Sequence, residues 1–266
     1  SFLNMIPVFG KLYDHVDVWI NFGLIDKVPT FDQVIQDWDG KMSTDPKNEK
    51  FTGFEAGFNL YSNDGTMASK LNLYSTTWSD RIQTKQVFNQ ETEDDEIIYL
   101  TGISQSHTGV EVELSGQMHP MVRMDIALGL GNWVFTDDAS GTYRDDNSDV
   151  SYGYALKDLK VGDMPQTTFA FGSTITPLDG FTLLVMYRHY LNHTSDWSPS
   201  SREYSDEANA DRLPSWETPA YGVLDIHGTY SLPIEFGPVK PQVFFHVFNA
   251  LDAVYIQDAT DNSNYN

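Results

Sequence analysis

Carboxylates and histidines are the residues of this sequence whose types and spacing could do chemistry. Glu111 and Glu113 stand two apart in GVEVELSGQ, residues 109–117, and on a β-strand this spacing separates the two carboxylates by about 7 Å. By distance alone, such a pair would suit an inverting glycosidase. His189 and His193 are four apart, which on a strand means roughly 13 Å, too far for one metal ion. A β-strand with one polar face repeats polar residues at every second position, and this explains these side chains more simply than catalysis or metal binding does.

No motif of a known catalytic class accompanies them. The sequence contains no GxSxG, no HExxH, no P-loop and no dinucleotide fingerprint. We therefore expect a protein that is not an enzyme and has no catalytic residue.

Acidic side chains gather in three polar segments that could hold calcium through oxygen ligands. The segments are TEDDE at 92–96, TDDASGTYRDDNSD at 136–149 and YSDEANAD at 204–211. None has the EF-hand pattern, with glycine at the sixth position and glutamate at the twelfth. Solvated acidic loops are the favoured interpretation, and calcium binding in these loops is the alternative. No other cofactor is expected. Whether the chain binds a metal ion stays open.

Residues 193–221 are the segment best supplied with side chains for holding a ligand. They combine aromatic platforms with hydrogen-bonding groups, which would suit a sugar or a metal chelate. The ligand-binding candidates are Trp197, Arg202, Tyr204, Arg212 and Trp216.

Alternation of apolar and polar residues predicts the strands that must position these groups. Period-2 patterns over most of the chain indicate about nine strands and almost no helix. We expect one face of the sheet to meet lipid and the other a wet lumen, although segments 181–190 and 241–249 are apolar on both sides. The lumen-facing candidates are Glu55, Glu111, Glu113, Asp125, Asp225 and His227. Aromatic residues near strand ends could form interfacial girdles; these are Trp19, Tyr61, Trp78, Tyr99, Trp133, Tyr190 and Tyr230.

The connections between the strands alternate between short and long. Tight turns are expected at 62–65, 116–120 and 176–180, with a slightly longer one at 231–240. Long polar loops are expected at 89–96, 136–165 and 192–219. All short turns then lie at one end of the sheet and all long loops at the other. This asymmetry is typical of an outer-membrane barrel, with short periplasmic turns and long extracellular loops.

Composition narrows the possible functions further. The chain has 266 residues, no cysteine and a formal net charge of -22. This charge repels nucleic acid phosphates, so no nucleic acid partner is expected. The lack of cysteine removes disulfides and thiol chemistry. No run of about 18 apolar residues exists, which excludes a transmembrane helix but not a transmembrane barrel.

Four segments resemble the barrels of TonB-dependent outer-membrane receptors. NEKFTGFEAGFNL at 48–60, LNLYSTTWSDRI at 71–82 and HTGVEVELSGQ at 107–117 are similar to successive barrel strands of that family. VFNALDAVYIQDA at 247–259 resembles the segment before its last strand. The resemblance implies an all-β, antiparallel up-and-down transmembrane barrel, of which residues 1–266 form a C-terminal part. The plug domain, the TonB box and the final strand of the family have no counterpart in this chain.

The function implied by the resemblance is TonB-dependent uptake of a scarce nutrient, a siderophore, cobalamin or a glycan, across the bacterial outer membrane. Its expected partners are outer-membrane lipids, a TonB complex acting through the plug domain, and a possible surface lipoprotein. Two alternatives remain open. One is a passive porin or structural surface barrel, and the other a secreted soluble β-sandwich that binds carbohydrate.

Overall fold

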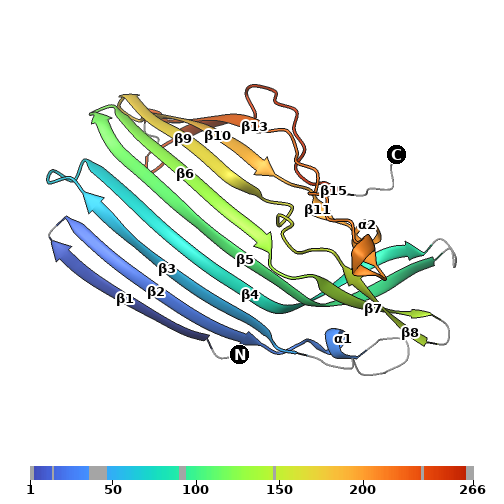
Figure 1. Ribbon diagram of the computed structural model, residues 1–266. Coiled ribbons are helices and arrows are strands. Elements are labelled where there is room, and N and C mark those ends of the chain that lie inside the picture. The colour runs from blue at the N-terminus through green and yellow to red at the C-terminus, as the bar shows by residue number, and fades with distance from the viewer. Residues whose placement is uncertain are drawn as a thin grey trace.

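The computed structural model describes residues 3–13, 15–35, 47–89, 94–145, 148–234 and 237–261. Its main feature is an antiparallel sheet in which ten strands follow one another in chain order (Figure 1). We call these ten strands the wall: β1 (Leu3–Tyr13), β2 (Val16–Lys27), β3 (Glu49–Tyr61), β4 (Met67–Asn89), β5 (Asp94–His119), β6 (Val122–Phe135), β9 (Pro165–Leu178), β10 (Phe181–His193), β13 (Tyr221–Ser231) and β14 (Gln242–Val247). The predicted all-β, up-and-down architecture is confirmed.

Among the strands of the wall, β1 is the one that the sequence pattern does not predict. Residues 3–13 lack clean alternation and contain Pro7, which cannot donate a backbone hydrogen bond to a neighbouring strand. In the structure β1 pairs only with β2, at the edge of the sheet. An edge strand tolerates proline, because one side of its backbone has no partner.

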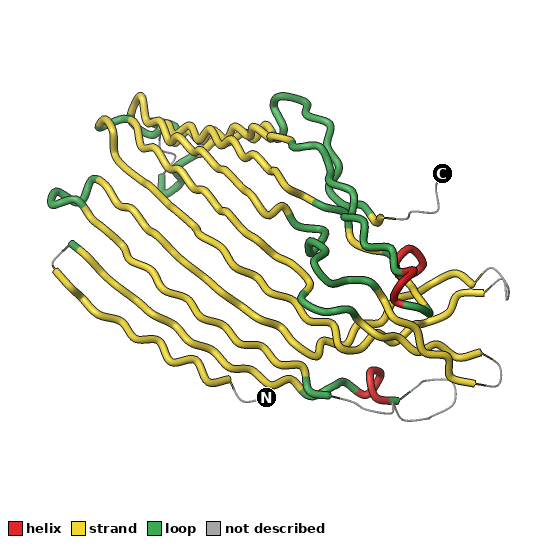
Figure 2. The backbone as a smooth tube through the Cα atoms, in the orientation of Figure 1, coloured by secondary structure: helices red, strands yellow, loops and turns green. Residues whose placement is uncertain are grey.

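The connections sort by length as predicted. Short turns join β3 to β4, β5 to β6 and β9 to β10 at one end of the sheet, and Figure 2 shows them at its left. The longer segments between β6 and β9 and between β10 and β13 lie at the other end. The predicted long loop at 89–96 is the exception, because β4 and β5 stay paired as far as Asn89 and Asp94.

Strands β4 and β5 form a hairpin that extends far beyond the rest of the wall. They have 23 and 26 residues, whereas a membrane-spanning strand needs about 9–11. Their register shifts between Trp78 and Gln83, near positive φ angles at Asp80 and Gly102. Such bulges bend a strand and change its direction. The half of this hairpin beyond the bulges therefore extends past the ends of the other wall strands.

The two faces of the wall differ in chemistry, and the strand register assigns each residue to one of them. The apolar face carries large exposed side chains in strand after strand, among them Ile20, Phe22, Phe54, Leu73, Leu114, Leu128 and Leu130. A soluble monomer rarely exposes so large an apolar surface. On β10 and β14, where the pattern was ambiguous, the apolar face holds Leu183 and Val185 and also Val243, Phe245 and Val247.

The long connections contain short elements of their own. These are α1 (Phe31–Val34), β7 (Ala139–Asp145), β8 (Ser148–Tyr154), β11 (Asp196–Trp197), α2 (Pro199–Arg202), β12 (Glu203–Tyr204), η1 (Glu207–Asn209) and β15 (Thr260–Asp261). β7 and β8 form a hairpin beside β5, while β11 pairs with β15 in parallel. No helix in the described ranges is long and apolar enough to cross a membrane.

Candidate ligand-binding face and loop cluster

The buried apolar core of the structure lies among the long connections at the loop end of the wall. Segments 136–145, 148–164, 194–219 and 256–261 fold together there, and we call them the loop cluster. Trp197 is 2% exposed and packs against Phe135 and Tyr154, with ring centroids 6.4 and 6.2 Å away. The rest of this core is formed by Leu100, Ile103, Ala139, Leu156 and Leu159. The cluster is therefore a packed unit.

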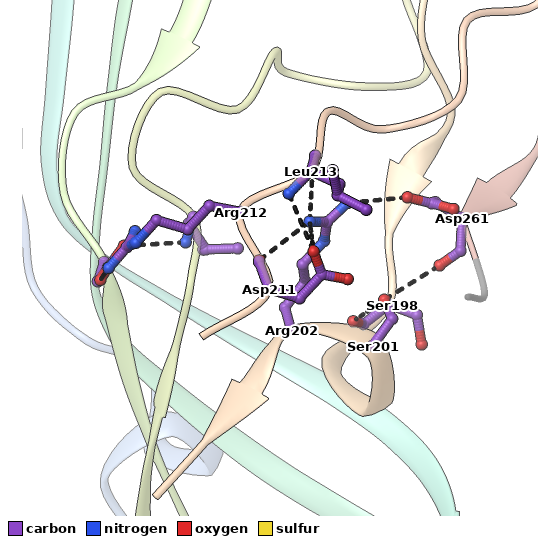
Figure 3. Close-up of polar contacts among 9 residues, drawn as sticks. Ser198, Ser201, Arg202, Asp211, Arg212, Leu213 and Asp261 are labelled. Carbon is purple, nitrogen blue, oxygen red and sulfur yellow. Dashed lines mark hydrogen bonds and ion pairs between the residues drawn. The ribbon is translucent and has the colours of Figure 1, made fainter. Parts of the chain in front are cut away.

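Arg202 joins two parts of the loop cluster that are distant in sequence. Its guanidinium donates to the backbone oxygens of Asp211 and Leu213, at 3.2 and 2.6 Å, and to Asp261 Oδ2 at 2.9 Å. Figure 3 shows its side chain between Asp261 and the 211–213 segment, whereas Arg212 points the other way. Arg202 is 2% exposed. A buried arginine needs such partners, because an unpaired buried charge is costly.

Asp138 is the second link within the loop cluster. Its carboxylate accepts two hydrogen bonds from Arg212, at 3.0 and 2.7 Å, and one from the Tyr204 hydroxyl at 3.1 Å. The backbone N–H groups of Leu156 and Lys157 also donate to it, at 3.1 and 2.9 Å. Hydrogen bonding by Arg212 is the largest cause that lowers the pKa of Asp138 to about 2. The ionised carboxylate thus ties residues 156–157 to residues 204–212.

The polar face of the wall carries aromatic side chains close to the loop cluster. Trp133 Nε1 donates to the Tyr74 hydroxyl at 2.9 Å, and the His107 ring lies 5.7 Å from the Trp133 ring. Tyr74 lies over Gly109 of the next strand, where an added Cβ would stand 2.3 Å from the Tyr74 hydroxyl. A glycine is needed there because any side chain would displace the ring.

A second aromatic group lies on β10 and β13. Tyr255, from the segment after β14, stacks on Tyr221 with centroids 4.4 Å apart and planes 7° apart. Tyr221 in turn contacts Tyr190, at 5.0 Å. Tyr255 remains 42% exposed. The three tyrosines form an accessible aromatic surface with hydroxyl groups, suited to a flat or hydroxylated ligand.

These positions correct the girdle interpretation. The register puts Trp19, Trp78, Trp133 and Tyr190 on the polar face, on which they cannot meet the lipid interface. Tyr230 is on the apolar face, and the Tyr99 side chain lies outside the described ones. Sequence reasoning missed Tyr221 and Tyr255 as a pair, because the stack joins separate segments. The only signal was the tyrosine in the 247–259 motif.

The five ligand-binding candidates occupy different surroundings. Trp197 and Arg202 are buried inside the loop cluster and contact the protein itself. Tyr204 and Arg212 both bind Asp138, while Trp216 is 49% exposed. The structure brings Tyr204 and Arg212 together, and ligand contact by the five residues stays a prediction.

The six lumen-facing candidates share the polar face, as the continuous register across β3 to β14 requires. Four of them are paired: Glu111 with Asn72 at 2.9 Å, Glu113 with Lys70 at 3.0 Å, Asp125 with Arg123 at 2.7 Å, and Asp225 with Arg188. His227 is 2.8 Å from His246, nitrogen to nitrogen. Glu55 lies opposite Asn21 and Tyr74 on the neighbouring strands. Glu113 and Asp125 line a hollow of about 480 Å³, and a lumen in front of this face stays a prediction.

Sets of three metal ligands do not converge in the described part of the chain. No group of three or more histidine, aspartate or glutamate side chains there could hold a metal ion. His189 is next to Tyr187, at 3.2 Å, and His193 is buried at the end of β10. Part of the acidic segment at 92–96 lies outside the described residues, and calcium binding stays a prediction.

Comparison with known proteins accounts for the two faces of the wall and for the sorting of its connections by length. The family model described as "TonB dependent receptor-like, beta-barrel" matches residues 5–250. The chain belongs to this family. The resemblance drawn from its motifs is confirmed, and membership of a family of outer-membrane receptors indicates an outer-membrane location. No curated protein sequence matches the chain significantly.

Solved structures of TonB-dependent receptors and transporters have the same fold. FpvA of P. aeruginosa, bound to heterologous pyoverdines, matches with a TM-score of 0.60 and 16% identity, over 98% of this chain and 30% of its own. Fiu of E. coli K12, a ferric-catecholate import receptor, has a TM-score of 0.60 and 15% identity over 97% and 32%. The copper transporter OprC has a TM-score of 0.66 and 13% identity over 97% and 35%. The chain thus spans about a third of the length of these proteins.

Proposed function

We propose that this chain is the C-terminal part of the barrel of an outer-membrane receptor that takes up an iron chelate. A plug domain and a final strand would belong to the rest of the full protein. The observation that carries the proposal is the aromatic lining of the polar face, which ends directly at a folded loop cluster. A wall with one lipid-compatible face and one polar, ring-lined face suits capture of an organic ligand from outside the cell.

The chemistry of the lining favours a chelate. Iron chelates present conjugated or hydroxylated surfaces, and the rings of Tyr190, Tyr221 and Tyr255 offer stacking faces and hydroxyl groups at one place. FpvA bound to pyoverdine and Fiu, a ferric-catecholate receptor, support this choice among the nutrients of the family. A glycan is the second candidate, because the same tyrosine stack also suits a sugar ring.

Uptake would be coupled to energy through the parts of the receptor outside this chain. The TonB complex would act on the plug domain, and the wall would supply the passage and the external binding surface without performing a reaction. A surface lipoprotein is a further partner that we propose. A passive porin would need no such coupling.

The test uses the full-length receptor in a host that lacks its own iron receptors. Uptake of radiolabelled iron chelates, cobalamin and oligosaccharides is measured with and without an uncoupler. We expect uptake of a chelate that the uncoupler abolishes. Uptake that the uncoupler leaves unchanged would support the porin instead, and uptake restricted to an oligosaccharide would support the glycan receptor.

Variants of the tyrosine stack sharpen this test. Tyr221→Ala and Tyr255→Ala each remove a stacking face, so we expect the KM for uptake to rise about tenfold. Tyr230→Ala is the matched control, because Tyr230 lies on the same strand but on the apolar face. Equal effects of Tyr221→Ala and Tyr230→Ala would show that the stack does not contact the cargo.

A further inference from the structure

Two histidines of neighbouring strands face each other on the polar face of the wall. His227 of β13 lies directly opposite His246 of β14 in the strand register. Their Nδ1 atoms are 2.8 Å apart, and their ring centroids are 4.9 Å apart. His227 is half-buried and His246 is exposed. The pair is therefore accessible to a small solute in front of the wall.

The contact between the two rings requires a proton. A neutral imidazole has one nitrogen that donates and one that accepts, so one Nδ1 must carry the hydrogen that the other accepts. In the described part of the chain this is the only hydrogen bond that either ring forms. The two nitrogens thus point toward one place between the strands, and a cation that binds nitrogen can replace the proton there.

The separation of the two nitrogens suits neighbouring positions around a metal ion. Nitrogens that bind a divalent ion at about 2.0 Å lie about 2.8 Å apart when their bonds make an angle of about 90°, and about 3.3 Å apart in a tetrahedron. The observed 2.8 Å corresponds to the first arrangement. Right angles between nitrogen ligands are typical of tetragonal Cu²⁺ and Ni²⁺. The pair therefore fits these two ions better than tetrahedral Zn²⁺.

Apolar rings lie next to the pair. The Phe248 ring is 5.4 Å from the His227 ring, and the Phe244 ring is 5.6 Å from the His246 ring, centroid to centroid. An apolar shell around a metal site limits the access of water and lowers the local dielectric constant. These rings therefore favour an ion held by nitrogen over a freely hydrated one.

The charged neighbours of the pair balance each other. Asp225 lies two residues before His227 on the same face, and its carboxylate accepts hydrogen bonds from Arg188 and from the backbone N–H of Asn249. This ion pair neutralises the arginine, which would otherwise repel a metal ion nearby. Because both carboxylate oxygens have partners, Asp225 does not act as a third ligand.

We propose that His227 and His246 form a binding site for a divalent transition metal ion, Cu²⁺ before Ni²⁺ and Zn²⁺. Each histidine supplies its Nδ1, and water fills the remaining coordination positions. Cu²⁺ comes first because nitrogen ligands bind it most tightly among the divalent first-row metals. The bound ion joins β13 to β14 and places a positive charge on the polar face. The site is independent of the cargo that the receptor takes up.

The experiment is a Cu²⁺ titration of the purified full-length receptor, free of any affinity tag, followed by electron paramagnetic resonance. Hyperfine couplings to nitrogen count the imidazoles that coordinate the bound ion. We expect the wild type to contain a site with two coordinating imidazoles. A receptor without such a site would overturn the proposal.

Two variants assign the signal to the pair. His227→Gln and His246→Gln each remove one ligand, so we expect the two-imidazole signal to disappear and the Cu²⁺ affinity of the site to fall at least about tenfold. His189→Gln is the matched control, because His189 lies on the apolar face beside Tyr187, and it should bind Cu²⁺ as the wild type does. Retention of the signal in either pair variant, or its loss in the control, would contradict the assignment.

A measurement on the wild type decides the matter if a variant fails to assemble. An ion that joins the two strands should slow hydrogen exchange of the 242–247 peptide, by about tenfold at a Ni²⁺ concentration of about ten times the dissociation constant. Ca²⁺, which prefers oxygen ligands, should leave this exchange unchanged. Unchanged exchange with Ni²⁺, or equal slowing by Ca²⁺, would overturn the proposal.

Discussion

The apolar face of the wall exposes large apolar side chains, whereas the loop cluster encloses a buried apolar core. Leu128, in the middle of β6, keeps 36% of its surface open, while Leu156 in the loop cluster keeps none. The charged residues differ in the same way, because most pairs on the polar face remain accessible and Arg202 is enclosed. The apolar face of the wall is thus arranged for lipid, and the loop cluster is arranged around a buried core.

The difference shows which solvent each region was built for. Apolar side chains in the wall gain little from packing on one another and depend on the membrane to cover them. Those of the loop cluster form a buried core together with Leu100, Ile103 and Phe135 of β5 and β6. Disturbing the two regions should therefore have different consequences, one for membrane assembly and one for local loop order.

The largest expected effect comes from placing a charge on the apolar face. Leu128→Arg puts a guanidinium near the middle of the wall, where lipid exposure costs about 2–4 kcal/mol. We expect the full-length receptor to lose most of its assembled fraction in the outer membrane. The measurement is the heat-modifiable mobility of the folded barrel in gel electrophoresis.

Ala127→Arg is the matched control for this prediction. Ala127 is the neighbouring residue, but it lies on the polar face opposite Glu113, with which an arginine would pair. We expect nearly normal assembly. Similar losses in both variants would mean that the faces are assigned wrongly.

A more local effect, with a smaller consequence for membrane assembly, is expected from Trp197→Ala. Removing a buried aromatic side chain costs about 3–5 kcal/mol, which should open the loop cluster while the wall stays assembled. Limited proteolysis of intact cells would then cleave within 194–219 faster than in the wild type. Trp216→Ala, at an exposed position in the same segment, should leave the cleavage rate unchanged, and equal acceleration in both variants would contradict the buried core.

The wall was far easier to predict from the sequence than the loop cluster. Its strands follow a local period of two, so Val110, Val112 and Leu114 could be assigned to one face without any knowledge of their neighbours. The one strand of the wall that the pattern does not predict, β1, breaks this period with Pro7. The pattern also does not predict β7 and β8, which lie within the expected loop at 136–165. Periodicity thus predicts the structure of strands whose residues face lipid on one side and water on the other.

The loop cluster could not be predicted because its contacts are distant in sequence and aperiodic. Trp197 and Arg202 were chosen as ligand-binding candidates for their residue types, yet Arg202 binds Asp261, 59 residues away. Asp138 looked like one of many acidic loop residues, and only the fold brings Arg212 to it across 74 positions. Composition indicates which groups can bind a ligand, but it does not show which of them already bind other residues of the protein.

The smallest expected effect is a loss of loop-cluster stability at low pH. The pKa of Asp138 is lowered to about 2 from its ordinary value of 3.8, so its links to Arg212 and Tyr204 stabilise the loop cluster fully above about pH 4. This contribution is lost progressively as the pH falls through about 2, because the folded carboxylate must then take up a proton. Hydrogen exchange of the 155–164 and 204–213 peptides, corrected for the intrinsic rate, should accelerate between pH 4 and pH 2.

Two variants separate this effect from general acid unfolding. Asp138→Asn should exchange faster already at pH 6 and show little further change between pH 4 and pH 2. Asp64, whose pKa is also about 2, lies in a turn at the opposite end of the wall, so Asp64→Asn should leave the exchange of both loop peptides as in the wild type. If Asp64→Asn removed the acid response of the loop cluster, the two ends of the molecule would be coupled through the wall, and the separation between wall and loop cluster would not hold.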